Sequence, residues 1–416
     1  MITIKVAPVI LKFFYIFIVL MAFWPFKYKF YPILGMNISA ADILLVMFFL
    51  FLIPMYFKKL PTTPSSKTSI KILYFIFVYS FLSMTWATQK VDSRYIVYQL
   101  VLMFLTVSIP YLISKIANDK HIDYHKLISN FATLLTAILL IYMVRNLGQD
   151  ERLDGYLGGA AIISVIIIPA LAVHLHNVLN RKRILISFIC LFISTVSIFY
   201  TESRAGLVML LLFLFITILR KPTILRLFAI VFISLVFIVS FGDKVSTDRY
   251  TSFEDTARDT ITETSMLWWK DSTASLFFGT GYGNVWQWAE YQKNKLPGED
   301  QKWFPTEKGP TMVHSHSVFG QSLAELGLVG LIPFLILVFI LFKETFKSWI
   351  RKYELKTNIL IGLICTLPTF YTDLMIFRNW EVSIIWLFFY FSALTYRPYL
   401  TNSKVKDNVK QNKMVA

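Results

Sequence analysis

Long runs of apolar residues, separated by short polar connections, dominate this chain of 416 residues. A helix of about 20 residues crosses the roughly 30 Å of lipid hydrocarbon. The helix is required because lipid offers no hydrogen-bond partner to backbone N–H and C=O groups. The pattern predicts an all-α polytopic membrane protein with twelve transmembrane helices, at residues 7–24, 33–57, 71–88, 95–114, 127–146, 156–178, 184–200, 204–219, 224–242, 318–342, 357–374 and 380–396.

The distribution of Lys and Arg predicts how these helices are oriented. With the N-terminus placed in the cytoplasm, every connection on that side is basic, as in Arg181-Lys182-Arg183, whereas the opposite connections carry few cations. Cytoplasmic loops of membrane proteins carry such an excess. Both termini are therefore expected in the cytoplasm. The first run carries Lys12 and lacks a small-residue cleavage site, which favours a retained span over a cleaved signal peptide.

One connection on the outer side is much longer than the others, and long loops are usually functional. Its residues 256–275 are compatible with a helix, whereas Pro297, Pro305 and Pro310 interrupt the later part. The tail is polar and expected to be disordered. The predicted organisation is nine transmembrane helices (1–242), an outer loop domain (243–317), three more helices (318–397) and a cytoplasmic tail (398–416).

Composition narrows the class further. Apolar residues make up 56% and charged residues 16% of the chain, which excludes a disordered protein and argues against an ordinary soluble enzyme. The formal charge is +16, and in a membrane protein such an excess marks cytoplasmic loops rather than nucleic acid binding. Cys190 and Cys365 both lie inside apolar runs, so neither a disulfide framework nor a cysteine metal site is expected.

A site on the outer face has no access to ATP, so any group transfer there needs a donor that arrives already activated. Sugars linked to a polyprenyl pyrophosphate are such donors. The glycine-rich stretch 279–283 lacks the strand–turn–helix context of a nucleotide site and is predicted to be a loop turn. A pyrophosphate at membrane depth calls for cations, and arginine is favoured because its planar fork pairs two oxygens at once.

Four outward arginines are candidates for that role. Arg204 stands before small residues at the mouth of two spans, although snorkelling to the interface or pairing with Glu202 is the alternative. Arg378 lies between the last two spans, with Asp373 close in sequence. The loop arginines, Arg249 and Arg258, would by default be solvated surface charges.

Two of the six histidines, His314 and His316, end the outer loop. A histidine can orient a sugar hydroxyl or take its proton. Two ligands without a third nearby are too few for a metal ion, so no metal site is predicted. As plain polar loop residues they would have no role in chemistry. Glu325, nine residues after His316, is expected to be structural or to pair with a neighbouring helix.

Taken together, these residues resemble the O-antigen ligase and O-antigen polymerase superfamily. The family pattern has an arginine in a short Ser-Arg-small segment, here residues 203–206, and a Gly-x-Gly-x-Gly-Asn stretch, here residues 279–284. It then has a histidine followed by Leu-Ala-Glu-Leu-Gly-Leu-x-Gly-Leu, here His316 and residues 323–331. The resemblance covers about residues 195–395. Ser317 departs from the family, which usually has Asn after the histidine.

The resemblance implies a chemistry and a location. The donor would be O-antigen polysaccharide on undecaprenyl pyrophosphate, the acceptor a sugar hydroxyl of lipid A–core, and the site the periplasmic face of a Gram-negative inner membrane. Neither nucleotide, metal nor other cofactor would take part, and membrane lipids but no nucleic acid would be partners. Arg204 and Arg258 would clamp the pyrophosphate, and His316 would orient or deprotonate the acceptor. Substrate would also be bound by Arg378, Asp373, His314 and Arg249.

Three functions stay open at this point. Ligase is favoured by Arg258 standing ten residues before Trp268, by the order of the loop up to His316, and by the Asp373 and Arg378 pair. A polymerase that joins lipid-linked repeat units shares most of the pattern. A transporter of lipid-linked sugars also has many spans, but no internal repeat and few interrupted spans are visible here.

Overall fold

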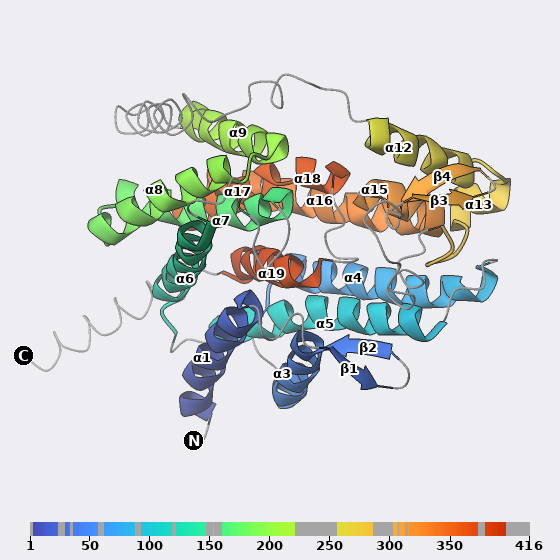
Figure 1. Cartoon of the computed structure of the whole chain (residues 1–416). Coiled ribbons are helices and arrows are strands. Elements are labelled where there is room, and N and C mark those ends of the chain that lie inside the picture. The colour runs from blue at the N-terminus through green and yellow to red at the C-terminus, as the bar shows by residue number, and fades with distance from the viewer. Residues whose placement is uncertain are drawn as a thin grey trace, which may run out of the picture.

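A computed structural model gives the fold (Figure 1). It describes residues 3–23, 30–33, 36–56, 62–87, 93–118, 122–146, 153, 160–220, 256–285, 303–306, 308–312, 315, 317–372 and 379–396. The helices are α1 (Thr3–Ala22), α3 (Ala40–Tyr56), α4 (Pro64–Ser83), α5 (Ser93–Ala117), α6 (Tyr124–Asn146), α7 (Ala160–Leu179), α8 (Ile184–Tyr200), α9 (Arg204–Arg220), α12 (Thr256–Trp269), α13 (Thr273–Phe278), α15 (Val318–Gln321), α16 (Gly327–Ile350), α17 (Glu354–Cys365), α18 (Pro368–Thr372) and α19 (Trp380–Thr395).

Short elements complete these helices. A 3-10 turn, η1 (Met84–Trp86), extends α4, and a π-helical turn, η3 (Ser322–Leu326), joins α15 to α16. One antiparallel hairpin pairs β1 (Phe30–Ile33) with β2 (Met36–Ser39), and a second pairs β3 (Trp303–Thr306) with β4 (Gly309–Met312). In the second hairpin Pro305 stands opposite Pro310, so two of the prolines predicted to interrupt the loop lie in a short strand pair.

The predominantly helical membrane character is confirmed. Among the described residues, five helices are long and apolar enough to cross a membrane: Pro64–Trp86, Ile96–Ala117, Tyr124–Asn146, Ile162–Leu179 and Val318–Ile350. Eleven of the predicted spans coincide with described helices, while the ninth, at 224–242, lies outside the described residues. The total of twelve and the division into four regions therefore stay predictions.

The predicted start of the second span, at residue 33, is wrong. Ile33 belongs to β1 and residues 36–39 form β2, and the helix begins at Ala40. The cause is a reciprocal cap: the Asp42 backbone N–H donates to Ser39 Oγ at 3.1 Å, and the Ser39 backbone N–H donates to Asp42 Oδ2 at 3.0 Å. Such a capping box satisfies donors that the first helical turn leaves open, so it fixes where the helix starts.

The eleventh span is interrupted, and the tenth is longer than predicted. α17 ends at Cys365 and α18 begins at Pro368, because proline lacks the N–H that would continue the first helix. The tenth span continues to Ile350 instead of ending at 342. The side chains that its added turns bury are polar, namely Glu344, Thr345 and Ser348.

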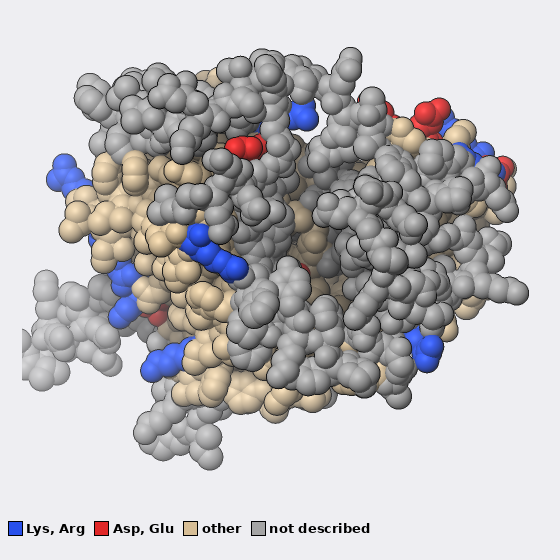
Figure 2. Space-filling view, viewed as in Figure 1, with Lys and Arg blue, Asp and Glu red and all other residues tan. Residues whose placement is uncertain are grey.

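The central helices are α7 and α19, which are buried on nearly all sides. α19 packs on α5 and α17, and α7 packs on α8 and α17. Many outward side chains are large and apolar, with Leu185 73% and Phe339 65% exposed, as expected of helices that face lipid. In Figure 2 the charged side chains of the described residues are scattered over the visible surface, and several lie at the end of the molecule where α12 and α13 are found.

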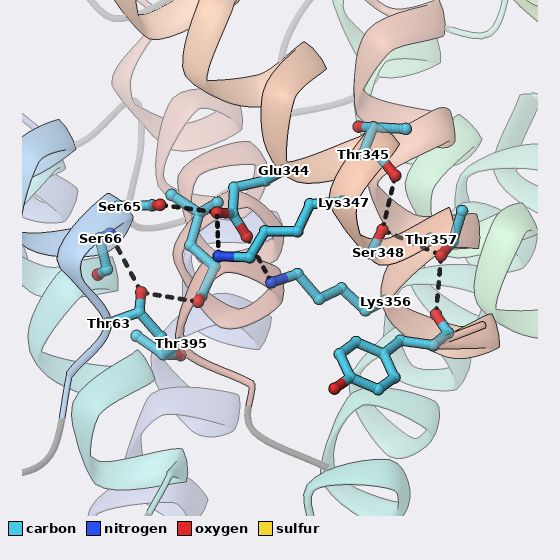
Figure 3. Close-up of polar contacts among 12 residues, drawn as sticks. Thr63, Ser65, Ser66, Glu344, Thr345, Lys347, Ser348, Lys356, Thr357 and Thr395 are labelled. Atoms are coloured by element: carbon cyan, nitrogen blue, oxygen red, sulfur yellow. Dashed lines mark hydrogen bonds and ion pairs between the residues drawn. The ribbon is translucent and has the colours of Figure 1, made fainter. Parts of the chain in front are cut away.

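One cluster of polar side chains within the bundle lies around Glu344 (Figure 3). The Glu344 carboxylate is 2.8 Å from Lys356 Nζ and accepts a hydrogen bond from Ser65 Oγ at 2.8 Å. Lys347 Nζ lies 3.6 Å from the same carboxylate. The Glu344 and Lys356 side chains are only 5% and 7% exposed. The buried ion pair therefore joins α16 to α17, and the hydrogen bond from Ser65 joins α4 to the same carboxylate.

Replacing only one member of the Glu344–Lys356 ion pair should destabilise the protein more than replacing both members. Glu344→Ala leaves the Lys356 ammonium buried without its partner, and we expect a loss of about 3–5 kcal/mol in the free energy of unfolding. The double variant Glu344→Met, Lys356→Met should be within about 1 kcal/mol of the parent, since well-packed apolar residues replace the pair. Thermal stability of the purified proteins in detergent measures both. A double variant less stable than Glu344→Ala would contradict the account.

Candidate functional site

The structure describes only some of the predicted site residues. Arg204 is the first residue of α9 and is partly exposed. Arg258 lies in the first turn of α12, and its side chain is outside the described residues. The remaining five predicted residues also fall outside the described residues: His314, His316, Arg249, Asp373 and Arg378. Their joint placement therefore stays a prediction, while the elements that flank them are described.

Arg204 is held by a tightly packed start of α9. Ser203 Oγ accepts a hydrogen bond from the Gly206 backbone N–H at 3.1 Å, which satisfies one open donor of the first turn. A Cβ on Gly206 would come within 2.5 Å of Ser164 Oγ on α7, so the glycine allows the two helices to approach closely. Glu202, just before, has a positive φ of 47° in the turn from α8. The turn therefore sets the direction of α9 relative to α8.

The elements next to the undescribed residues pack against one another. Ser317, which directly follows His316, caps α15 by accepting from the Gly320 N–H at 3.1 Å. Its hydroxyl also donates to the Phe370 carbonyl of α18 at 3.5 Å, three residues before Asp373. Serine is among the best capping residues, so the departure from the family's Asn keeps a helix cap here.

α9 and α12 join the same group of elements. Thr369 Oγ1 of α18 lies 3.1 Å from Met209 Sδ of α9. On the other side α12 packs against α15, where a Cβ on Gly320 would meet Ser265 Oγ at 3.7 Å. α9 begins with Arg204 and α12 carries Arg258, while α15 begins two residues after His316 and α18 ends one residue before Asp373. These four elements thus form one connected set, in which α18 lies between α9 and α15, and α12 lies farther along beside α13 (Figure 1).

The glycine motif is built onto the π-helical turn. The Thr280 backbone N–H and Oγ1 both donate to the Ala324 carbonyl at 3.0 Å, and the Gly281 N–H donates to the Glu325 carbonyl at 3.0 Å. A π turn widens the helix and changes the pattern of its internal hydrogen bonds. Here the carbonyls of η3 take donors from the loop instead. The prediction that residues 279–283 form a turn is confirmed, with positive φ at Gly279, Gly281 and Gly283.

Glu325 fastens the end of the same motif. Its side chain is fully buried, accepts from the Val285 backbone N–H at 3.1 Å, and accepts from Gln321 Nε2 at 3.0 Å. Both hydrogen bonds agree with the structural role expected for Glu325; one donor comes from the loop and the other from the preceding turn of the same segment. Burial, and then the nearby Glu325 carboxylate, raise the pKa of the Tyr282 phenol, so this group stays protonated at neutral pH.

The loop is also attached to α4 and α12. The Tyr282 backbone N–H donates to Ser83 Oγ at 2.9 Å, and Tyr79 OH donates to the Phe278 carbonyl at 2.9 Å. On the opposite side Trp268 of α12 is buried against Val285 and Ala324. The outer loop therefore has its own small apolar core, which rests on η3.

Alanine at two of these glycines should destabilise the protein strongly. A Cβ at Gly279 would lie 2.2 Å from the Glu325 carbonyl oxygen, and one at Gly327 would lie 2.5 Å from the Gly279 nitrogen. Both residues also have positive φ. We expect each replacement to cost about 3 kcal/mol in the free energy of unfolding.

Gly320 provides the matched control for this prediction. Its nearest neighbour would be Ser317 Cβ at 3.4 Å, an ordinary contact, so Gly320→Ala should change the free energy of unfolding by less than about 1 kcal/mol. Melting temperatures of the three variants in detergent give the comparison. Equal melting temperatures for Gly279→Ala and Gly320→Ala would show that the close approach to η3 is wrong.

Asp42 is a residue that sequence reasoning missed. It is 6% exposed and accepts from Ser39 and from Tyr98 OH, with a further hydrogen bond from the Trp380 side chain. It thereby joins α3, α5 and the start of α19, two residues after Arg378. A carboxylate inside an apolar run is costly and often functional, and this signal was available in the sequence.

An apolar cavity continues inward from the converging elements. Its lining includes Val318 and Phe334 from α15 and α16, Phe370 from α18, and Trp386 from α19. Val318 stands two residues after His316, and Phe370 three residues before Asp373. The cavity has a volume of about 20 Å³, which is room for about one water molecule.

In the described part of the chain, no group of three or more His, Cys, Asp or Glu side chains could hold a metal ion. The two histidines considered for a metal lie outside it. Both cysteines are free and buried.

Comparison with known proteins finds a similar family. Residues 189–335 match the family model described as O-antigen ligase. No curated protein matches the chain significantly. The matched segment contains Arg204, the outer loop, His316 and η3, which are the motifs that carried the resemblance. This part of the membrane protein is therefore similar to the O-antigen ligase family, whose members transfer glycans.

Proposed function

We propose that this protein ligates undecaprenyl-pyrophosphate-linked O-antigen polysaccharide to a sugar hydroxyl of lipid A–core. The observation that carries the proposal is the packing of α9, α12, α15 and α18 into one connected set. α9 begins with Arg204 and α12 carries Arg258, while α15 begins two residues after His316 and α18 ends one residue before Asp373. The alternative, polymerisation of lipid-linked repeat units, uses the same donor chemistry with a different acceptor.

In the proposed reaction the acceptor hydroxyl oxygen attacks the anomeric carbon of the donor sugar. The bond from that carbon to the phosphate oxygen breaks, and undecaprenyl pyrophosphate leaves with the electron pair. His316 orients the hydroxyl and accepts its proton. Arg204 and Arg258 pair with the pyrophosphate oxygens and stabilise the charge that grows on them.

The remaining predicted residues bind substrate. Arg378 and Asp373 shape the headgroup pocket, and His314 and Arg249 contact the bound glycan or pyrophosphate. No metal, nucleotide or other cofactor takes part.

The proposed location is the inner membrane of a Gram-negative bacterium, with both termini in the cytoplasm and the site on the periplasmic face. The support is the basic character of every connection on the other face. The polar end formed by α12, α13 and the β3–β4 hairpin then lies in the periplasm (Figure 1).

Transfer in a purified system tests the activity. The protein in lipid nanodiscs is mixed with lipid-linked O-antigen and lipid A–core, without ATP and with a chelator present. We expect lipid A–core to gain polysaccharide. Lengthening of the lipid-linked glycan, with lipid A–core unchanged, would replace ligase by polymerase, and no transfer to either acceptor by folded protein would reject both.

A further inference from the structure

A second cavity lies at the far end of α16 from the proposed site. α16 has 24 residues and is thus about 36 Å long, and the glycine motif contacts its first residue. The cavity encloses about 410 Å³ between the turn that joins α7 to α8, the turn that joins α16 to α17, the start of α6, and Tyr396. It opens on the face that the Lys and Arg pattern assigns to the cytoplasm.

The lining of this cavity is cationic. Lys182 comes from the first turn, and Arg351 and Lys352 come from the second. Within the described part of the chain, none of the three forms an ion pair with an acidic side chain. The one carboxylate in the lining, Glu354, is already paired with Arg220 Nη2 at 2.7 Å. The cavity therefore attracts an anion.

Two histidines add donors that suit an anion. His125 and His176 line the cavity with ring centroids 5.5 Å apart. His125 Nε2 is buried and has no hydrogen-bond partner in the described part of the chain. Buried polar atoms are rarely left without a partner. Solvent does not reach Nε2, so a bound oxyanion becomes its partner when the ring turns toward the cavity.

Helix C-caps hold the cations in place. Arg181 and Lys352, with φ of 54° and 57°, are the left-handed residues that follow α7 and α16. The Lys182 N–H donates to the Asn177 carbonyl at 2.8 Å, and the Tyr353 N–H donates to the Ser348 carbonyl at 3.0 Å, which is the bond pattern of a Schellman cap. Both turns that supply the cations are therefore fixed in the same way.

The surface beside the cavity is apolar. Trp349 and Ile350, next to Arg351, are 43% and 64% exposed, and Ile184 and Leu185, next to Arg183, are 50% and 73% exposed. An anion that also carries acyl chains could place its phosphate in the cavity and its chains along these side chains. Tryptophan at this depth is typical of the lipid–water interface.

We propose that this cavity is a binding site for a phosphate group, and that an anionic phospholipid of the cytoplasmic leaflet supplies it. Lys182, Arg351 and Lys352 neutralise the phosphate, and the His125 ring turns so that Nε2 donates to one of its oxygens. The site is separate from the proposed glycan transfer and does not depend on it. Basic pockets between helices on this face of membrane proteins suit such headgroups.

Lipid binding to purified full-length protein in detergent tests the proposal. Native mass spectrometry and melting temperature are followed while phosphatidylglycerol, phosphatidylethanolamine or inorganic phosphate is added. We expect phosphatidylglycerol to bind at least ten-fold more tightly than phosphatidylethanolamine, and to raise the melting temperature. Phosphate that binds as tightly as phosphatidylglycerol would make free phosphate, not lipid, the source of the group.

Variants locate the binding. Lys182→Gln with Lys352→Gln should weaken phosphatidylglycerol binding at least ten-fold and leave the lipid-free melting temperature unchanged, since both are surface turn residues. Lys71→Gln with Lys343→Gln removes two exposed cations on the same predicted face and should keep wild-type binding. Equal losses in both double variants, or no loss in the first, would overturn the proposal.

Discussion

Replacing His316 with alanine is expected to lower the rate of glycan transfer by about 10²- to 10⁴-fold, the usual contribution of a positioned general base. The reason is that the acceptor hydroxyl is a poor nucleophile until its proton is withdrawn. The expected measurement is transfer to lipid A–core in nanodiscs, with binding of the lipid-linked donor followed separately. Donor binding should change little, because the arginines hold the pyrophosphate.

His314→Ala is the matched control, since it removes a histidine two residues away from the same segment. It should retain transfer within about ten-fold of the parent, as expected for a substrate contact rather than a base. If His314→Ala is inactive and His316→Ala is active, the roles of the two histidines are reversed. If both variants are active, no histidine of this pair is the base.

Replacing Arg204 with alanine is expected to lower the rate of glycan transfer by about 10²- to 10³-fold, the second large effect. Arg204 begins α9 at the close contact with α7, so its guanidinium projects from a rigid element. Such a position suits a cation that must meet the charge growing on the leaving pyrophosphate. Arg204→Lys should recover part of the activity, because the charge remains while the two-pronged fork is lost.

Two further measurements make the Arg204 result specific. The amount of protein in the membrane and its melting temperature should equal those of the parent. Arg145→Ala removes the cation at the end of α6, on the same predicted side, and should transfer glycan normally. Normal lipopolysaccharide in an Arg204→Ala strain would remove this residue from the mechanism.

The sequence predicted the helices well because hydropathy reflects the solvent that each helix faces. It failed where local hydrogen bonds override hydropathy. The apolar run that starts at residue 33 reads as one span, yet the Ser39–Asp42 capping box begins the helix at Ala40. Pro368 similarly divides a run that is apolar throughout.

The site could be predicted in part. The glycine turn follows from its sequence, but its partner does not, because Thr280 and Ala324 are 44 residues apart and meet only through the fold. The π turn at Ser322–Leu326 likewise has no signature in the residues. Asp42 was visible as a carboxylate in an apolar run, yet its link to Trp380 depends on α3, α5 and α19 packing together.

The central claim, that the chain joins finished O-antigen to lipid A–core, is tested most directly by deleting its gene. Lipopolysaccharide is resolved on a gel, and lipid-linked glycan is extracted from the same cells. Ligase predicts loss of the whole ladder down to bare core, with long glycan accumulating on the carrier lipid. Core that carries a single repeat unit, without long lipid-linked glycan, would contradict it and identify a polymerase.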